Sequence, residues 1–159
     1  MTRLPLLLPL IAACADLPCG AADLGTAGVE ATIDGTEWVG SGASWTMAGT
    51  AAQIVTETVD GYRLTLVGQS AADGQALSEA LALGGAVDVP LGEHGFAVVY
   101  DADGSWAGNT DGSGELTFLL DGAELSACFS FTGTSSDGGT IEVADGAVRA
   151  LCMSAEGCQ

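Results

Sequence analysis

The sequence predicts an all-β domain, an antiparallel sandwich or barrel of about 8–10 short strands joined by Asp-Gly hairpins. Asp-Gly occurs eight times, at positions 34, 60, 73, 103, 111, 121, 137 and 145. This dipeptide is the strongest short hairpin signal when alternating apolar residues flank it. The spacing between the copies is irregular, which indicates hairpin turns rather than a tandem repeat.

Short apolar runs lie between these turns, and most of them alternate with polar residues as half-buried strands do. They cover residues 31–33, 38–39, 62–66, 96–100, 116–120, 125–131, 141–143 and 148–150. Asp145-Gly146 interrupts the last two runs as a bulge or a turn. The segment from Gly74 to Gly85 fits a short helical turn and a strand equally well, because Leu77 and Leu81 are at helical spacing while Leu81 and Leu83 alternate.

The composition restricts the classes of partner. The chain has a formal net charge of −18, with three basic residues against 21 acidic ones, and it contains no lysine. Because nucleic-acid binding requires Lys and Arg to neutralise phosphates, nucleic acid is excluded as a partner. An anionic lipid surface would also repel the chain. The acidic residues are scattered, which favours a role in solubility.

The first fourteen residues, MTRLPLLLPLIAAC, decide where the protein is expected to reside. Their apolar run, 4–13, is about half the length that a membrane-spanning helix needs. One positive residue, a short apolar centre and a cysteine after two small residues resemble the signal peptide of a bacterial lipoprotein, with Ile11 to Cys14 as its lipobox. An ordinary secretory signal is the alternative.

The lipoprotein resemblance implies removal of residues 1–13 and acylation of Cys14 with palmitate-type chains that anchor the protein to a membrane. Ala15 follows the cysteine, which favours the outer membrane of the cell envelope over the inner membrane or free secretion. Residues 14–28 are acidic and rich in Gly and Ala, as a tether is. Residues 29–159 then form a single β domain.

The four remaining cysteines are Cys19, Cys128, Cys152 and Cys158. An even number in an oxidising compartment predicts two disulfides, for which three connectivities are open. Cys128 and Cys152 fall on opposite faces of their strands, and a regular sheet does not allow a bridge between opposite faces. This favours Cys19–Cys128 with Cys152–Cys158. The spacing does not suit a zinc site.

Two stretches resemble a family of small bacterial lipoproteins that carry an uncharacterised domain. The first is Ala31-Thr32-Ile33-Asp34-Gly35-Thr36-Glu37-Trp38, which matches the family's Ala-x-Ile-Asp-Gly-x-x-Trp opening. The second, within 114–150, has the Phe-x-Phe strand at 129–131, then Gly138-Gly139-Thr140-Ile141-Glu142-Val143. The chain departs from the family at Val148, where Phe is usual, and at Cys128, where a small residue is usual. The resemblance implies no activity and no functional residues.

Three sets of residues could carry chemistry. Calcium ligands are suggested by one acidic stretch, although the Glu that ends an EF-hand loop is replaced by Leu120; the candidate ligands are Asp101, Asp103, Asn109 and Asp111. His94, the only histidine, follows Glu93, but neighbours on a strand point in opposite directions and no Gly-x-Ser-x-Gly motif is present. The third set, Trp38, Trp45 and Trp106, could line a groove for a ligand or pack in the core.

Together these observations predict a lipid-anchored, extracytoplasmic β domain that is not an enzyme, with a structural or protein-binding role in the envelope. One alternative is a β-barrel that binds a small apolar or sugar ligand. Another is a surface adhesion module stabilised by calcium. No other cofactor is predicted.

Overall fold

The computed structural model describes residues 17–108, 114–154 and 158. These residues form the following elements. The strands are β1 (Val29–Ile33), β2 (Thr36–Gly40), β3 (Ser44–Ala48), β4 (Ala51–Val55), β5 (Arg63–Gly68), β6 (Val87–Asp88), β7 (Gly95–Tyr100), β8 (Ser105–Ala107), β9 (Gly114–Asp121), β10 (Glu124–Thr134) and β11 (Thr140–Cys152). The helices are η1 (Ala21–Asp23), which is a 3-10 helix, and α1 (Leu77–Ala82). The predicted all-β class is confirmed.

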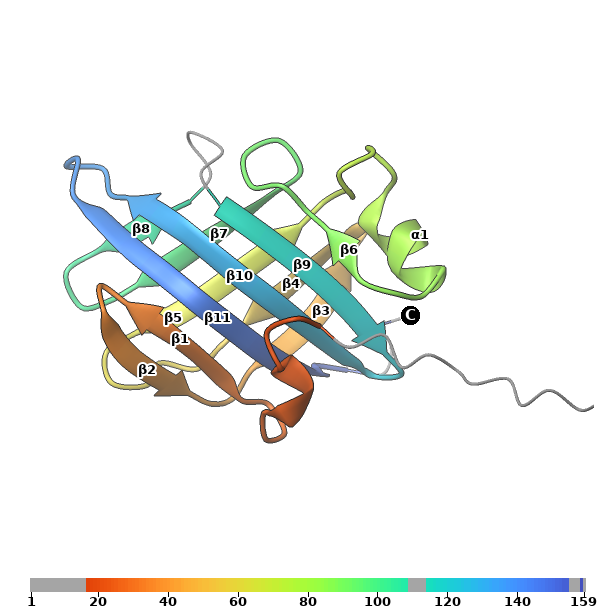
Figure 1. The fold of residues 1–159 in the computed structure, drawn as a ribbon, viewed down its shortest axis with the longest axis horizontal. Coiled ribbons are helices and arrows are strands. Elements are labelled where there is room, and N and C mark those ends of the chain that lie inside the picture. The colour runs from red at the N-terminus through yellow and green to blue at the C-terminus, as the bar shows by residue number, and fades with distance from the viewer. Residues whose placement is uncertain (1–16, 109–113, 155–157, 159) are drawn as a thin grey trace, which may run out of the picture.

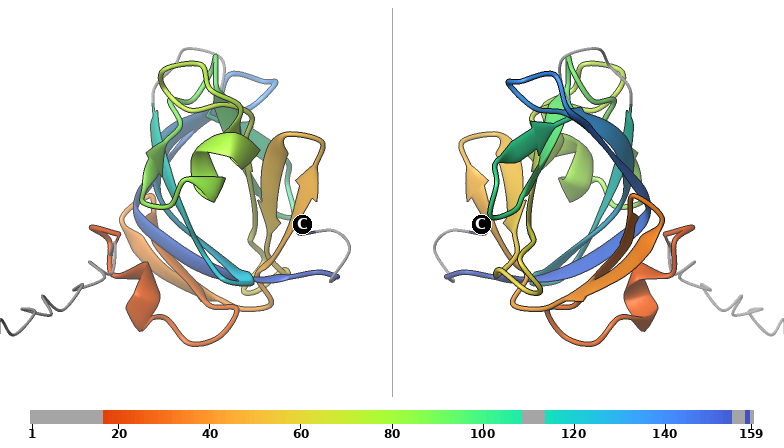
Figure 2. Two further views of the ribbon diagram at one scale, coloured as in Figure 1. Left: turned by 90° about the vertical axis from the view of Figure 1, so that its right-hand side faces the viewer. Right: turned by 90° about the vertical axis from the view of Figure 1, so that its left-hand side faces the viewer.

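The sheet closes into a ring, which we call the barrel. Each strand pairs with the next in the order β11-β3-β4-β5-β7-β8-β10, and β10 pairs with β11 again. Figure 2 shows these strands curving around a common interior. The pairs are antiparallel, as predicted, apart from β11 with β3, where Leu151 and Cys152 pair in parallel with Ser44 and Trp45.

Two long strands make the closure possible because each changes partner along its length. β11 pairs with β1 through Val143–Val148 and with β3 further on. β10 pairs with β9 through most of its length and with β8 at Thr134. The sheet therefore continues outside the ring, as β1–β2 beyond β11 and as β9–β6 beyond β10. In Figure 1 the broad wall in front consists of β9, β10 and β11.

The Asp-Gly pairs lie where the sequence placed them, in the connections or at a bulge. Asp34 and Gly35 form the two-residue turn between β1 and β2, with φ of 47° and 77°, as a type I′ turn requires. Asp145 has a φ of 50° inside β11, where the pairing with β1 and with β10 changes register. This is a β-bulge. Asp111-Gly112 lies outside the described residues.

Three of the barrel strands, β3, β4 and β8, lie outside the runs that the sequence predicted. β3 and β4 pair from Ser44–Val55 to Ala48–Ala51, with Gly49-Thr50 as the turn. This turn has no Asp-Gly signal, although Gly49 has a positive φ of 65°. β4 is also rich in alanine, a residue that is depleted in strands.

Large side chains fill the interior, and glycines in the strands make room for them. Trp45 and Phe118 are both almost completely buried. A Cβ added to Gly68 would lie 2.5 Å from Leu77 Cδ2 and 2.6 Å from Phe118 Cε2. Such close complementarity of glycine and large side chains is typical of a packed core. It favours a filled interior over one that holds a ligand.

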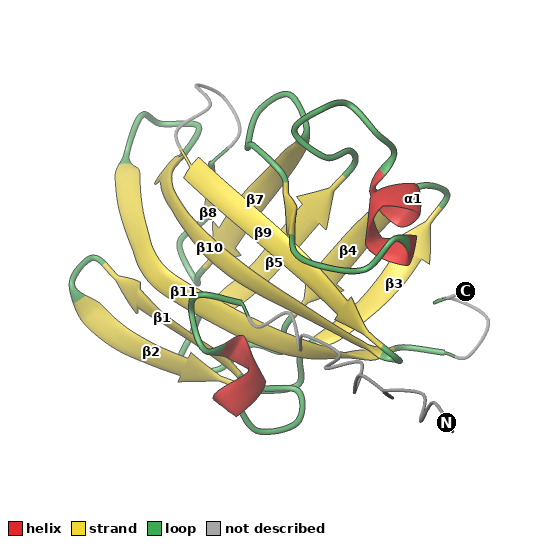
Figure 3. Cartoon of the chain, turned by 45° about the vertical axis from the view of Figure 1, so that its right-hand side comes forward, coloured by secondary structure: helices red, strands yellow, loops and turns green. Residues whose placement is uncertain are grey.

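The ambiguous segment Gly74–Gly85 contains the helix α1. Leu77 and Leu81 are buried on one side of the helix, which is the consequence of their helical spacing. The Ser78 N–H donates to the Thr50 carbonyl in the β3–β4 turn. Figures 2 and 3 show α1 lying across one end of the barrel, while η1 lies outside the wall.

Candidate functional site: the stapled N-terminal segment

Residues 17–28, which we call the N-terminal segment, pack against the outside of the β9–β10–β11 wall. Figure 1 shows the segment, in red and orange, in front of these strands. Leu17 is 5% exposed and Ala21 is completely buried, against Ala147 of β11. We call this small apolar group the outer cluster; it consists of Leu17, Ala21 and Ala147 with the partly buried Cys19, Leu24, Leu119 and Cys128.

A disulfide fixes the N-terminal segment to the wall. Cys19 and Cys128 are bonded, with their Cα atoms 5.7 Å apart, which is a usual separation for a disulfide. We call this bond the staple. Cys128 lies on the outward face of β10 because its neighbours Ala127 and Phe129 point into the barrel. The staple therefore joins two parts of the chain 109 residues apart without entering the core.

Arg149 makes a second link between the N-terminal segment and β11. Its backbone N–H donates to the carbonyl of Gly28 over 2.9 Å, and its guanidinium donates to the Leu24 carbonyl over 3.4 Å. The same guanidinium forms an ion pair with Glu124, with Nε 2.6 Å from Oε2. The charges of Arg149 and Glu124 thus cancel beside the staple.

The second disulfide joins Cys152 to Cys158, with their Cα atoms 6.0 Å apart. Both cysteines pack against the edge of the main core. The predicted pairing of the four cysteines is therefore the one observed. The pairing follows from the side of the sheet on which each cysteine lies. Cys128 points outward, while Cys152 continues the inward series of Val148 and Ala150.

The anchor predicted at Cys14 lies outside the described residues, as do residues 1–13. Most of the predicted tether, 14–28, is described, and from Leu17 onward it is packed against the wall rather than extended away from it. The sequence did not predict this packing, because a stretch rich in Gly and Ala offers few apolar side chains. Its clearest signal was Cys19.

The residues proposed for calcium are only partly described. Asp101 lies in the β7–β8 connection, where its Oδ1 accepts hydrogen bonds from the N–H groups of Asp103 and Gly104 at 2.7 and 3.0 Å. This carboxylate stabilises the turn. Asn109 and Asp111 lie outside the described residues.

His94 has a partner that the sequence did not reveal. Ser70 Oγ lies 2.7 Å from His94 Nδ1, and both side chains are partly buried. The carbonyl of His94 also accepts hydrogen bonds from the N–H groups of Gln69 and Ser70. A serine beside a histidine is part of a nucleophile–base arrangement, but these bonds chiefly join the connection after β5 to the one before β7. No local pattern links residues 24 positions apart.

The tryptophans belong to the packing of the barrel. Trp38 and Trp45 are buried, and their indole N–H groups donate to the carbonyls of Val59 and Ala123 at 3.1 and 3.0 Å. Trp106 is partly buried and packs against the main core. A buried indole with its hydrogen bond satisfied is a structural element.

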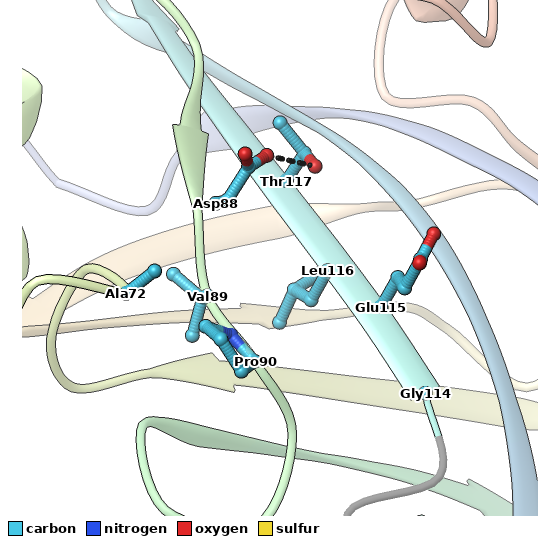
Figure 4. A pocket seen from close by; sticks show the side chains of 8 residues that line it. All are labelled: Ala72, Asp88, Val89, Pro90, Gly114, Glu115, Leu116 and Thr117. Carbon is cyan, nitrogen blue, oxygen red and sulfur yellow. Dashed lines mark hydrogen bonds between the residues drawn. The ribbon is translucent and has the colours of Figure 1, made fainter.

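A hollow with a volume of about 490 Å³ lies beside the β6–β9 pair. Figure 4 shows its lining residues, which come from the connection after β5, from β6 with the two residues that follow it, and from β9. Thr117 Oγ donates to Asp88 Oδ1 over 2.8 Å at one end. Val89 and Pro90 provide apolar surface, and Glu115 adds a second carboxylate. A smaller hollow of about 200 Å³ borders both cysteines of the staple.

The described acidic residues include one with a clearly shifted pKa. The pKa of Asp137, in the β10–β11 turn, is lowered from its usual value by the hydrogen bond from the Ser135 hydroxyl, and then by the N–H of Gly139. The lowered pKa therefore comes from hydrogen bonds within the turn. Within the described residues, no group of three or more His, Cys, Asp or Glu side chains is placed to hold a metal ion.

Neither helix of the described chain has the length and hydropathy of a membrane-spanning segment. In comparisons with known proteins, no family model matches the chain and no curated protein is detectably similar.

Proposed function

We propose that this protein is a lipid-anchored, extracytoplasmic domain of the bacterial cell envelope, with a structural or protein-binding role and no catalysis. Cys14 carries the acyl chains, and the outer membrane is the favoured location. The observation that carries the proposal is the staple, which fixes the chain to the barrel five residues after the proposed anchor. Two disulfides also suit an oxidising compartment.

The packed interior supports a binding or structural role in which the outer surface makes the contacts. Trp45, Phe118 and the other large buried side chains occupy the space that a ligand inside the barrel would need. The resemblance to small bacterial lipoproteins supports the same proposal, because those lipid-anchored proteins have a similar opening stretch and similar closing strands.

Intact mass of the protein extracted from bacterial membranes without reduction tests the proposal. The expected mass starts at Cys14, includes two or three acyl chains, and is four hydrogens short because of the two disulfides. The control is Cys14→Ser, which should lose the lipid mass and leave the membrane fraction. A wild-type chain that starts elsewhere and carries no lipid would contradict the anchor.

A second candidate is the binding of a small polar ligand such as a sugar in the 490 Å³ hollow. Asp88, Glu115 and Thr117 offer the acceptors and donors that sugar hydroxyls need, beside the apolar surface of Val89 and Pro90. Calorimetric titration with a panel of monosaccharides should detect binding, which Asp88→Asn should weaken while Asp137→Asn leaves it unchanged. An absence of heat across the panel would remove this candidate.

The third candidate is the calcium-stabilised adhesion module. A calcium site formed by Asp101, Asp103, Asn109 and Asp111 would raise the unfolding temperature in calcium over that in chelator, because a ligand that binds only the folded state stabilises it. Equal melting temperatures in both buffers would remove the calcium site.

A further inference from the structure

The first observation is the short distance available between the proposed anchor and the barrel. Leu17 follows Cys14 by three positions, and a chain spans at most ~3.6 Å per residue. The acylated cysteine is therefore within about 11 Å of Leu17. Leu17 is 5% exposed in the outer cluster, and the staple holds the chain two residues later. The point at which the chain leaves the wall is thus fixed.

The second observation is the charge next to that point. The protein is strongly acidic, and Arg63 and Arg149 are the only basic side chains in the part that the structure describes. Arg149 lies beside the outer cluster, where its ion pair neutralises Glu124. On the other side of the staple, Glu115 and Asp145 border the same hollow as Cys19 and Cys128, whereas Glu142 lies toward the hollow that borders β10 and β11. The wall therefore carries a neutralised ion pair on one side of the staple and two carboxylates on the other, so the acyl chains rather than charge attraction hold the bilayer at this surface.

On the basis of the lipid anchor proposed above, we propose that the bilayer surface lies against the outer face of the β9–β10–β11 wall, around the outer cluster. The opposite wall, formed by β4 and β5, then faces away from the membrane and is the surface open to envelope partners. Figure 2 shows the two walls on opposite sides of the barrel, with the N-terminal segment on the first. The staple limits the separation between barrel and membrane. If the N-terminal segment were released up to Val29, the available span from Cys14 would rise to about 54 Å.

The absence of lysine from the whole chain makes this orientation measurable, because a single introduced lysine is the only side-chain amine. Two positions are matched: Ser126 on β10 and Gln53 on β4 are both polar and partly exposed, and each is the third residue of its strand. Ser126 lies two residues from Cys128 of the staple, and Gln53 lies on the opposite wall. The variants are Ser126→Lys and Gln53→Lys in the full-length acylated protein.

Each variant is labelled with an amine-reactive fluorophore and bound to phosphatidylcholine vesicles whose headgroups carry a short-range spin-label quencher. The wild-type protein, treated in the same way, gives the contribution of any free α-amine. Several-fold stronger quenching is expected at position 126 than at position 53. Replacing Cys19 and Cys128 by serine should reduce this ratio, because release of the N-terminal segment lengthens the span to the membrane.

The two proposals fail in different ways. Intact mass of the vesicle-bound protein is measured first, and a chain without lipid contradicts the anchor and the orientation together. Lipidated protein with equal quenching at the two positions, or with stronger quenching at 53, overturns the orientation and leaves the anchor standing.

Discussion

The two faces of the β9–β10–β11 wall are held in different ways. On the inner face, Phe118 and Phe129 are buried among large apolar side chains and fit against glycines of β5 and β11 respectively. On the outer face, the N-terminal segment contributes Leu17 and Ala21 to a much smaller cluster. The staple ties the outer face to the N-terminal segment, whereas the Cys152–Cys158 disulfide lies only at the edge of the main core.

This difference follows from the amount of apolar surface each face removes from water. Burying apolar area stabilises by about 25 cal/mol per Å², so a cluster of a few small side chains contributes little against the entropy cost of ordering a segment. A disulfide reduces that cost by restricting the unfolded chain. We therefore expect the inner face to respond mainly to changes in packing and the outer face mainly to loss of the staple.

The largest effect is expected on the inner face. Phe118→Ala removes a completely buried ring that lies close to Gly68. The substitution should lower the free energy of unfolding by about 3–5 kcal/mol. Urea denaturation measures this value. The control is Thr117→Ala on the outward side of the same strand, which should cost at most about 1.5 kcal/mol, the value of one hydrogen bond. Similar losses in both variants would contradict the packed interior.

Loss of the staple comes next. Replacing Cys19 and Cys128 by alanine should lower the free energy of unfolding by about 2–4 kcal/mol. The staple closes a loop of 109 residues and the second disulfide one of six, so the loop-entropy difference favours the staple by roughly 2–3 kcal/mol. Denaturation of each double variant, with the other disulfide intact, compares the two. An equal or larger loss for the Cys152 and Cys158 pair would contradict this ranking.

A smaller effect is expected at the bulge in β11, where Gly146 lies against a ring of the inner face. Gly146 is paired with Phe129, and a Cβ on it would lie 2.2 Å from the Phe129 ring. Gly146→Ala should therefore cost about 1–3 kcal/mol through overpacking. Phe129→Leu in the same chain should recover part of that cost, which a double-mutant cycle detects as a coupling energy. Additive losses would show that the ring is not the cause.

The smallest effect belongs to the β10–β11 turn, outside both faces. The lowered pKa of Asp137 means that its contribution to stability is present above the ordinary value of 3.8 and is lost as the pH falls through the lower folded-state pKa. Titration followed by NMR should place this pKa below 3.8. Ser135→Ala should raise the pKa toward the ordinary value, while Ser136→Ala should leave it unchanged.

Local patterns in the sequence were sufficient for several parts of this structure. Asp34-Gly35 could be identified as a hairpin turn because the required backbone is one that few other dipeptides adopt easily. The disulfide pairing was favoured correctly because side chains alternate between the faces of a strand, which separates Cys128 from Cys152. The cysteines therefore identified the staple, although not the packing of the segment that carries it.

Other features depended on contacts between distant residues. Strands β3 and β4 are not predictable from Asp-Gly pairs because their turn is Gly49-Thr50. The choice between helix and strand for Gly74–Gly85 depends on the burial of Leu77 and Leu81 on the same side of α1. The contact of Ser70 with His94 likewise depends on two connections meeting.

The sequence by itself determined the class of fold, the Asp-Gly turns and the faces of Cys128 and Cys152, since all three depend on residues a few positions apart. The tertiary structure decided the closure of the ring, through pairing of Ser44 with Leu151, and the position of the N-terminal segment on the wall. Such contacts are selected by the apolar surface that they bury together, which no single stretch of the chain specifies.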